Sequence, residues 1–182
     1  METELNSKYC VRNSKKGKRG IVELARAIPD AANKTMVEIG SYAGESTLVF
    51  ANHFKFVHTV DPWLNDYDDS TTSTTHPMEI IEGQFDLRMK DKDNFQKLKM
   101  TSVEAEKLFE DESLDFVYID GCHSYEAIKE DIGLWMPKVK TGCHLAGHDY
   151  YKRFPGAIKI VDETFGTDFE LFADTSWLVV KK

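Results

Sequence analysis

The stretch VEIGSYAGEST, residues 37–47, joins a short apolar strand, Thr35–Ile39, to a helix that starts near Ser46. Gly40 and Gly44 lie between these two elements, where glycine lets the backbone turn tightly and approach a ligand closely. The spacing is G-x-x-x-G, and the full G-x-G-x-x-G fingerprint of dinucleotide-binding proteins is absent. Such a loop suits a nucleoside without a pyrophosphate. Taken alone, the motif is equally compatible with an ordinary tight turn.

Strands and helices alternate on both sides of this motif. Further strands are predicted at Phe56–Val60, Gln96–Met100, Leu114–Ile119 and Cys143–Ala146, and helices at Arg19–Ala27, Met78–Lys90, Val103–Phe109, Tyr125–Trp135 and Pro155–Phe165. Two last strands, Phe169–Phe172 and Trp177–Val180, are so close in sequence that they must pair antiparallel. The order predicts an α/β fold, a three-layer Rossmann-like sandwich around a seven-stranded, mostly parallel sheet with an antiparallel C-terminal hairpin strand.

The length of 182 residues suits one domain and leaves little room for two. Residues 1–18 are polar and predict a flexible N-terminal arm, followed by a single domain over residues 19–182. Residues 62–77 are rich in Asp, Asn, Ser and Thr, which predicts a long loop. Because loops of this length are usually lids, binding loops or disordered, we expect a lid or substrate insertion at about 62–95.

The composition excludes several classes of protein. The net charge of −8 argues against non-specific binding to nucleic acid, which depends on neutralising phosphates. No apolar run reaches the length of a membrane span, and the polar N-terminus does not resemble a signal peptide. The three cysteines, Cys10, Cys122 and Cys143, are too few and too scattered for a disulfide framework or a zinc site. We therefore expect a cytoplasmic protein.

Ligands of such sheets bind at the carboxyl ends of the strands, so the residues just after each strand are the candidates. Asp61 lies 21 positions after Gly40, where a carboxylate can accept hydrogen bonds from both hydroxyls of a ribose. Trp63 is expected to lie against an adenine face, and Ser102 lies where an adenine contact is also expected, on a weaker sequence signal. The structural alternatives are a turn residue at Asp61 and a core anchor at Trp63.

Two further motifs follow neighbouring predicted strands: Asp120-Gly121-Cys122-His123 and Gly147-His148-Asp149-Tyr150. If the strands are adjacent, Asp120 and Asp149 converge on one pocket, and paired carboxylates suit a hard divalent cation. His148 is a further candidate ligand or a partner of the ligands. His123 has a pKa range suited to a general base near neutral pH. Helix capping and hydrogen bonding are the alternative roles of Asp120 and His123.

Together these motifs resemble the class I S-adenosylmethionine-dependent methyltransferases. VEIGSYAGEST resembles their glycine-rich first motif, VDPW at Val60–Trp63 resembles their acidic second motif, and the C-terminal hairpin is typical of their fold. The stretch LDFVYIDGCHSYEAIKEDIGLWMPKVKTGCHLAGHDYY, residues 114–151, resembles bacterial small-molecule O-methyltransferases of the macrocin type and, more distantly, of the catechol type. The resemblance covers roughly residues 19–182.

The resemblance implies S-adenosylmethionine as the cofactor and a set of residues around it. The cofactor-binding candidates are Glu38, Gly40, Ser41, Tyr42, Gly44, Ser46, Asp61, Trp63, Ser102 and Asp120. In metal-dependent relatives magnesium is bound at the position of Asp120 and by an acidic pair after the next strand. Here that pair is His148-Asp149, so Mg²⁺ remains an open expectation with Asp120, Asp149 and His148 as candidate ligands. His123, with Asp120, is the catalytic candidate.

The implied reaction is methyl transfer to an oxygen of a small molecule such as a sugar or phenol. The sequence leaves three alternatives open: an NAD-dependent oxidoreductase, a non-catalytic nucleoside-binding protein on the same fold, and a nucleic-acid methyltransferase, which the charge disfavours. We expect a small-molecule acceptor, no nucleic acid and no membrane partner. A homodimer is compatible with this fold, and no sequence feature marks an interface.

Overall fold

The computed structural model describes residues 4–10, 12, 14–65 and 76–182. Its strands are β1 (Thr35–Ile39), β2 (Phe56–Val60), β3 (Phe95–Leu98), β4 (Leu114–Ile119), β5 (Val139–Gly147), β6 (Glu170–Leu171) and β7 (Trp177–Val180). Its α-helices are α1 (Lys15–Ala27), α2 (Glu45–Ala51), α3 (Met78–Met89), α4 (Ser102–Ala105), α5 (Tyr125–Trp135) and α6 (Pro155–Phe165). Short 3₁₀ turns at Ser7–Tyr9, Ala31–Asn33 and Glu106–Leu108 complete the described elements.

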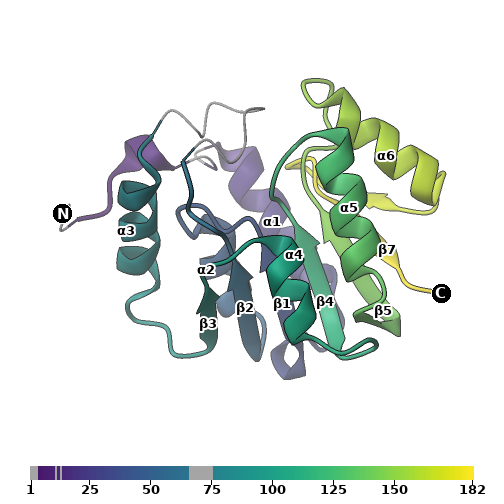
Figure 1. Cartoon of the computed structure of the whole chain (residues 1–182), viewed down its shortest axis with the longest axis horizontal. Helices are drawn as coiled ribbons and strands as arrows, with labels where there is room; N and C mark the ends of the chain where they lie inside the picture. Colours follow the sequence, from purple (N-terminus) through teal and green to yellow (C-terminus); the bar gives the residue numbers. More distant parts are fainter. Residues whose placement is uncertain (1–3, 11, 13, 66–75) are drawn as a thin grey trace.

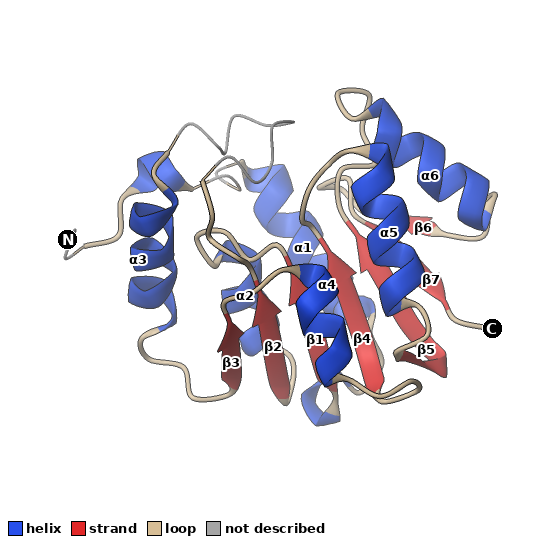
Figure 2. Ribbon diagram, in the orientation of Figure 1, coloured by secondary structure: helices blue, strands red, loops and turns tan. Residues whose placement is uncertain are grey.

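The strands form one seven-stranded sheet with the order β3-β2-β1-β4-β5-β7-β6 (Figures 1 and 2). Strands β1 to β5 run parallel, and β7 is antiparallel to both β5 and β6. This confirms the predicted α/β fold with its antiparallel C-terminal hairpin. The strand order reverses between β1 and β4, so a crevice is expected at the carboxyl ends of these two strands.

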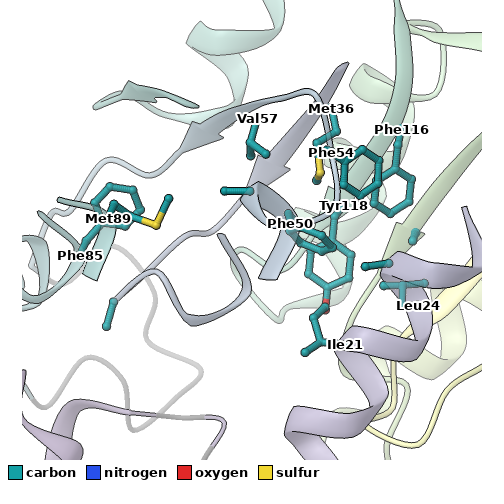
Figure 3. Packing of buried hydrophobic residues seen from close by; sticks show 14 of the residues in the cluster. Ile21, Leu24, Met36, Phe50, Phe54, Val57, Phe85, Met89, Phe116 and Tyr118 are labelled. Atoms are coloured by element: carbon teal, nitrogen blue, oxygen red, sulfur yellow. The ribbon is translucent and has the colours of Figure 1, made fainter. Parts of the chain in front are cut away.

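Side chains on the two faces of the sheet form separate buried clusters, because successive residues of a strand point to opposite faces. On one face α1, α2 and α3 cover a cluster rich in aromatic rings, in which Phe54 stacks on Phe116 at 5.4 Å (Figure 3). On the other face α4, α5 and α6 cover a cluster that contains the fully buried Trp135 and Trp177. The three layers leave the strand ends accessible for ligands.

The N-terminal segment differs from the flexible arm that its polar composition predicts. Helix α1 begins at Lys15, four residues earlier than expected, because the Ser14 side chain caps it by accepting a hydrogen bond from the Gly17 amide. Tyr9 is buried and its ring contacts His76 edge-on at 5.1 Å. The Arg12 side chain is buried as well. The prediction of a flexible arm is therefore wrong for the described residues of this segment.

The strand predicted at Cys143–Ala146 is longer than expected. It begins at Val139 as β5, and its pairing with β4 shifts register between Leu114 and Phe116. Residues 66–75 of the predicted long loop lie outside the described residues. No helix in the described part of the chain combines the length and the apolar character that crossing a membrane requires.

Candidate active site

A cavity of about 530 Å³ lies where the carboxyl ends of β1, β2, β4 and β5 meet. Its walls come largely from the loops after these strands: Gly40–Ala43, Asp61–Pro62, Asp120–His123 and His148–Asp149. Ser46 of α2, Ser102 of α4 and Arg12 from the N-terminal segment also line it. The structure thus brings most of the predicted site residues around one cavity, at the topological switch point of the sheet.

The loop after β1 depends on its glycines. Gly40 has φ of +84°, and a Cβ atom at this position would lie 2.0 Å from the carbonyl oxygen of Asp120. Only glycine allows the loops after β1 and β4 to lie so close together. Gly44, with φ of +79°, precedes α2 and packs on Phe85; it supports the loop and does not itself line the cavity. Ser41 and Tyr42 both line the cavity as predicted.

Glu38 occupies a different place from the one predicted. Its side chain is fully buried beneath the loop and does not line the cavity. One carboxylate oxygen accepts hydrogen bonds from Thr47 and Thr59, which ties β1 to α2 and β2, while the other has no hydrogen-bond partner among the described residues. Burial raises the pKa of Glu38 to about 7, against the lowering effect of its hydroxyl partners. Glu38 therefore supports the glycine loop from below.

This raised pKa predicts a pH dependence of stability. The folded-state pKa lies above the ordinary value of 4.5, so the contribution of Glu38 is present below pH 4.5 and is lost as the pH rises through 7. In Glu38→Gln, the decrease in unfolding free energy between pH 5 and pH 8 should be smaller than in the wild type by about 2 to 3 kcal/mol. Urea unfolding at both pH values measures this. Glu126→Gln, on the exposed face of α5, is the control; equal decreases in Glu38→Gln and the wild type would contradict the prediction.

Asp61 lies at the wall of the cavity with both oxygens oriented by the backbone. Its Oδ2 accepts a hydrogen bond from the Tyr42 amide and its Oδ1 from the Trp63 amide, each at 2.8 Å. Burial raises the pKa of Asp61 in spite of these hydrogen bonds. Each oxygen keeps a second lone pair, so the carboxylate can still accept from a ligand diol.

Trp63 does not lie in the cavity, so the expected adenine stacking is wrong. Its ring is buried, contacts Phe85 edge-on at 5.1 Å, and donates from Nε1 to the Tyr42 carbonyl at 2.9 Å. Trp63 has a positive φ of 44°, and its indole packs in the same buried cluster as α3. Burial of its large aromatic surface determines the orientation of Trp63, which acts as the core anchor named above as its structural alternative.

Ser102 lines the cavity together with a residue that the sequence analysis missed, Asp131 of α5. The Ser102 hydroxyl donates to Asp131 and accepts from Trp135 Nε1 at 2.8 Å. Burial raises the pKa of Asp131 to about 6. A signal was present in the sequence, because Asp131 falls on the apolar stripe of its helix, beside Ile128 and Ile132.

The loops after β4 and β5 bring an imidazole and two carboxylates together. His123 Nε2 lies 2.6 Å from Asp149 Oδ2, and the imidazole stacks on the Phe154 ring at 4.8 Å. Although burial alone would raise it, the pKa of Asp149 is held well below its usual range by hydrogen bonds from His123 and His148. Single donor atoms of Asp120, His123 and Asp149 lie within 4.8 Å of one another, as a bound metal would require.

His148 was expected as a metal ligand, but this cluster contains His123 in its place. His148 Nδ1 lies 3.1 Å from Asp149 Oδ1 and 3.4 Å from Asp120 Oδ1, and Nε2 lies 2.7 Å from the Asp174 carbonyl. Both ring nitrogens thus contact protein oxygens. Burial would lower the pKa of His148, but the carboxylates outweigh this effect and raise it to about 9.

Arg12 is the second residue that the sequence analysis missed. Its Nη2 donates to an oxygen of Asp120 and to the Tyr118 hydroxyl, and its Nη1 lies 3.2 Å from Asp174 Oδ2. The partners are 106 to 162 positions away in sequence, so no local pattern relates them to Arg12. Asp120 was expected to bind a metal cation. Its Oδ2 instead pairs with the positively charged guanidinium of Arg12.

Comparisons with known proteins agree with this architecture. A family model described as a methyltransferase domain matches residues 37–150. None of the curated proteins matches the chain. Among solved structures, precorrin 8w decarboxylase from Methanobacterium thermoautotrophicum has a TM-score of 0.66 at 13% identity, over 98% of this chain and 96% of that one.

Two further solved structures share the fold. A Klebsiella pneumoniae protein described as an O-methyltransferase has a TM-score of 0.60 at 13% identity, over 97% of this chain and 85% of that one. A phosphoethanolamine N-methyltransferase from Haemonchus contortus, in complex with phosphoethanolamine and S-adenosylhomocysteine, has a TM-score of 0.59 at 15% identity. That match covers 83% of this chain but only 30% of the Haemonchus chain.

The family model spans more than half of the chain and contains the glycine loop, Asp61, Asp120, His123 and Asp149. The strand order with its antiparallel C-terminal hairpin and the cavity at the switch point fit the same family. The chain therefore belongs to the class I S-adenosylmethionine-dependent methyltransferases.

Proposed function

We propose that this protein transfers a methyl group from S-adenosylmethionine to a hydroxyl oxygen of a small molecule, such as a sugar or a phenol, with His123 as the general base. The observation that carries the proposal is the His123–Asp149 contact of 2.6 Å at the wall of the cavity. The Klebsiella structure of the same fold is described as an O-methyltransferase, which is consistent with an oxygen acceptor.

The cavity suits the cofactor in size and in chemistry. Its volume of about 530 Å³ lies within the usual range for small-ligand sites. Asp61 offers two oriented oxygens to a ribose, and Ser102 with Asp131 forms a polar wall where we place the adenine. Gly40 and Asp120, whose backbones approach closely, line the part of the cavity where we place the rest of the nucleoside.

The charges around the cavity also favour a cationic methyl donor. Among the described lining residues, six carboxylates face two arginines and His148, whose pKa is raised to about 9; the carboxylates are Glu45, Asp61, Asp120, Glu130, Asp131 and Asp149. When bound, S-adenosylmethionine supplies a methyl group activated by a positively charged sulfonium. An acidic cavity attracts that cation and repels the phosphates of nucleic acid, which supports a small-molecule acceptor.

The chain's own residues then orient the acceptor and remove its proton. When the Nε2–H of neutral His123 donates a hydrogen bond to Asp149, the basic lone pair of the imidazole lies on Nδ1, the atom that we assign to accept the hydroxyl proton. Asp149 stabilises the imidazolium that results, and Phe154 holds the ring in place by stacking. Leu64 and Met78, which flank residues 66–75, line the cavity and give the acceptor apolar contacts. We assign to the segment 62–95 the role of shaping the acceptor end.

A thermal-shift experiment tests the cofactor. S-adenosylhomocysteine at 100 times its dissociation constant should add about 2.7 kcal/mol to the unfolding free energy, and NAD should add nothing. In Asp61→Ala the dissociation constant for S-adenosylhomocysteine should rise by about 10- to 100-fold, because hydrogen bonds to a charged group are lost. Titration calorimetry measures this directly.

Asp86→Asn is a matched control, since Asp86 is an exposed carboxylate on α3 that pairs with Lys97. Stabilisation by NAD alone would identify an oxidoreductase and overturn the proposal. The oxygen acceptor is tested separately, by following S-adenosylhomocysteine release with panels of hydroxyl compounds, amines and RNA. Turnover with amines or RNA and none with hydroxyl compounds would leave the cofactor assignment intact and refute the acceptor.

A further inference from the structure

The carboxylates that could hold a metal are already paired within the protein. Asp120 Oδ2 faces the Arg12 guanidinium, and Asp149 Oδ2 lies 2.6 Å from His123 Nε2. The remaining two oxygens, Asp120 Oδ1 and Asp149 Oδ1, lie 3.4 Å and 3.1 Å from His148 Nδ1. All four carboxylate oxygens of the pair therefore have a nitrogen partner.

This arrangement does not fit Mg²⁺. Magnesium requires near-octahedral coordination by oxygen atoms and gives up its water reluctantly. To reach Asp120 and Asp149 the ion would have to displace three nitrogen partners, and it would then lie beside a guanidinium that remains protonated at every pH of interest. The positive charge of Arg12 already supplies the neutralisation of Asp120 that a metal would supply.

Arg12 is held in place too firmly to move aside easily. Its side chain is 8% exposed, and Tyr118, Asp120 and Asp174 all accept from or pair with its two terminal nitrogens. Its backbone amide donates to Glu45 Oε2 at 3.0 Å, which ties the segment to the start of α2. Removing this arginine would take the guanidinium away from the buried Asp174 carboxylate and leave Asp120 with His148 as its cationic neighbour.

We propose that Arg12 takes the place of a divalent cation in this site, and that the enzyme works without a bound metal. Arg12 is a positioning residue, since it acts through Asp120 and its terminal donors are taken up by protein partners. The inference rests on the proposed methyl transfer only for its catalytic consequence. The pairing by itself predicts that the site does not bind a divalent cation, and this can be measured without any reaction.

The test uses Mn²⁺ alone as the probe, followed by electron paramagnetic resonance on the full chain. The wild type should bind no Mn²⁺ at the site at millimolar concentration. Arg12→Gln should bind one Mn²⁺ at least tenfold more tightly, and the double variant Arg12→Gln/Asp120→Asn should lose it again. Arg12→Lys keeps a cation and should behave like the wild type. Arg19→Gln, which removes an exposed arginine of an i,i+4 ion pair, is the matched control.

Binding of one Mn²⁺ by the wild type that is abolished in Asp120→Asn overturns the inference, and this comparison decides the matter even if Arg12→Gln does not fold. In activity assays EDTA should leave the rate of the wild type unchanged, whereas Arg12→Gln should be slowed and partly restored by Mg²⁺. Loss of wild-type activity in EDTA with recovery in Mg²⁺ also overturns it. Absence of turnover under all conditions refutes the proposed function, while the Mn²⁺ measurement still decides the role of Arg12.

Discussion

Replacement of His123 by alanine is expected to lower kcat by about 10²- to 10⁴-fold, the usual contribution of a general base. The imidazole is the only neutral nitrogen base that we assign to the acceptor end of the cavity, and Asp149 orients it at 2.6 Å. Because we place the acceptor, and not the cofactor, beside His123, the affinity for S-adenosylhomocysteine should change by less than about twofold to threefold. Initial rates of S-adenosylhomocysteine formation and a calorimetric titration measure both quantities.

His53→Ala is the matched control for this variant. His53 lies near the C-terminal end of α2, contacts the Val49 carbonyl and does not line the cavity. Its removal should leave the rate within about twofold of the wild type. If His123→Ala keeps the wild-type rate, His123 is not the base, and the Asp149 contact is structural.

Replacement of Gly40 by alanine is expected to destabilise the fold by about 4 kcal/mol or more and to abolish stabilisation by S-adenosylhomocysteine. The new methyl group would lie 2.0 Å from the Asp120 carbonyl oxygen, which belongs to the backbone and cannot rotate away. The adjacent strands β1 and β4 pair up to Ile39 and Ile119, so separating the two loops would break their hydrogen bonds. Urea unfolding and thermal shift measure the two effects.

The variant Gly142→Ala distinguishes the stability lost through steric overlap from the stability lost through backbone strain. Gly142 has φ of +79°, close to that of Gly40, but among the described residues no neighbouring atom lies within 4 Å of the place that its Cβ would take. This variant should cost only the left-handed strain of about 1–2 kcal/mol. If Gly40→Ala and Gly142→Ala lose equal stability, close packing of the two loops is not what requires glycine at residue 40.

The local pattern of the sequence was sufficient to predict most of the elements of the fold. The bounds of β1, β2, β4, β7 and α6 agree with the prediction because each is an apolar segment bounded by a charge, a glycine or a proline. The start of β5 was predicted four residues too late, at Cys143, because Gly142 is a local signal for a strand end, whereas the register shift depends on pairing with β4.

The candidate site was predicted in part. Asp61, Asp120, His123 and Asp149 follow strands, so their convergence could be expected from topology alone. Trp63 follows β2 and Glu38 lies near the end of β1, yet both side chains point into the protein, since the orientation of a side chain near a strand end depends on its packing. Arg12 could not be found in this way. Its segment is polar and lacks periodicity, and its burial depends on carboxylates more than 100 positions away.

The pairing of Arg12 with Asp174 has a consequence for biosynthesis. These residues are 162 positions apart, and Asp174 lies between the last two strands. A nascent chain whose C-terminal hairpin is still inside the ribosome has the glycine loop and Asp61 available, but Arg12 lacks one of its two carboxylates. The full set of Arg12 partners can therefore form only after residue 174 has been synthesised, later than the glycine loop and Asp61.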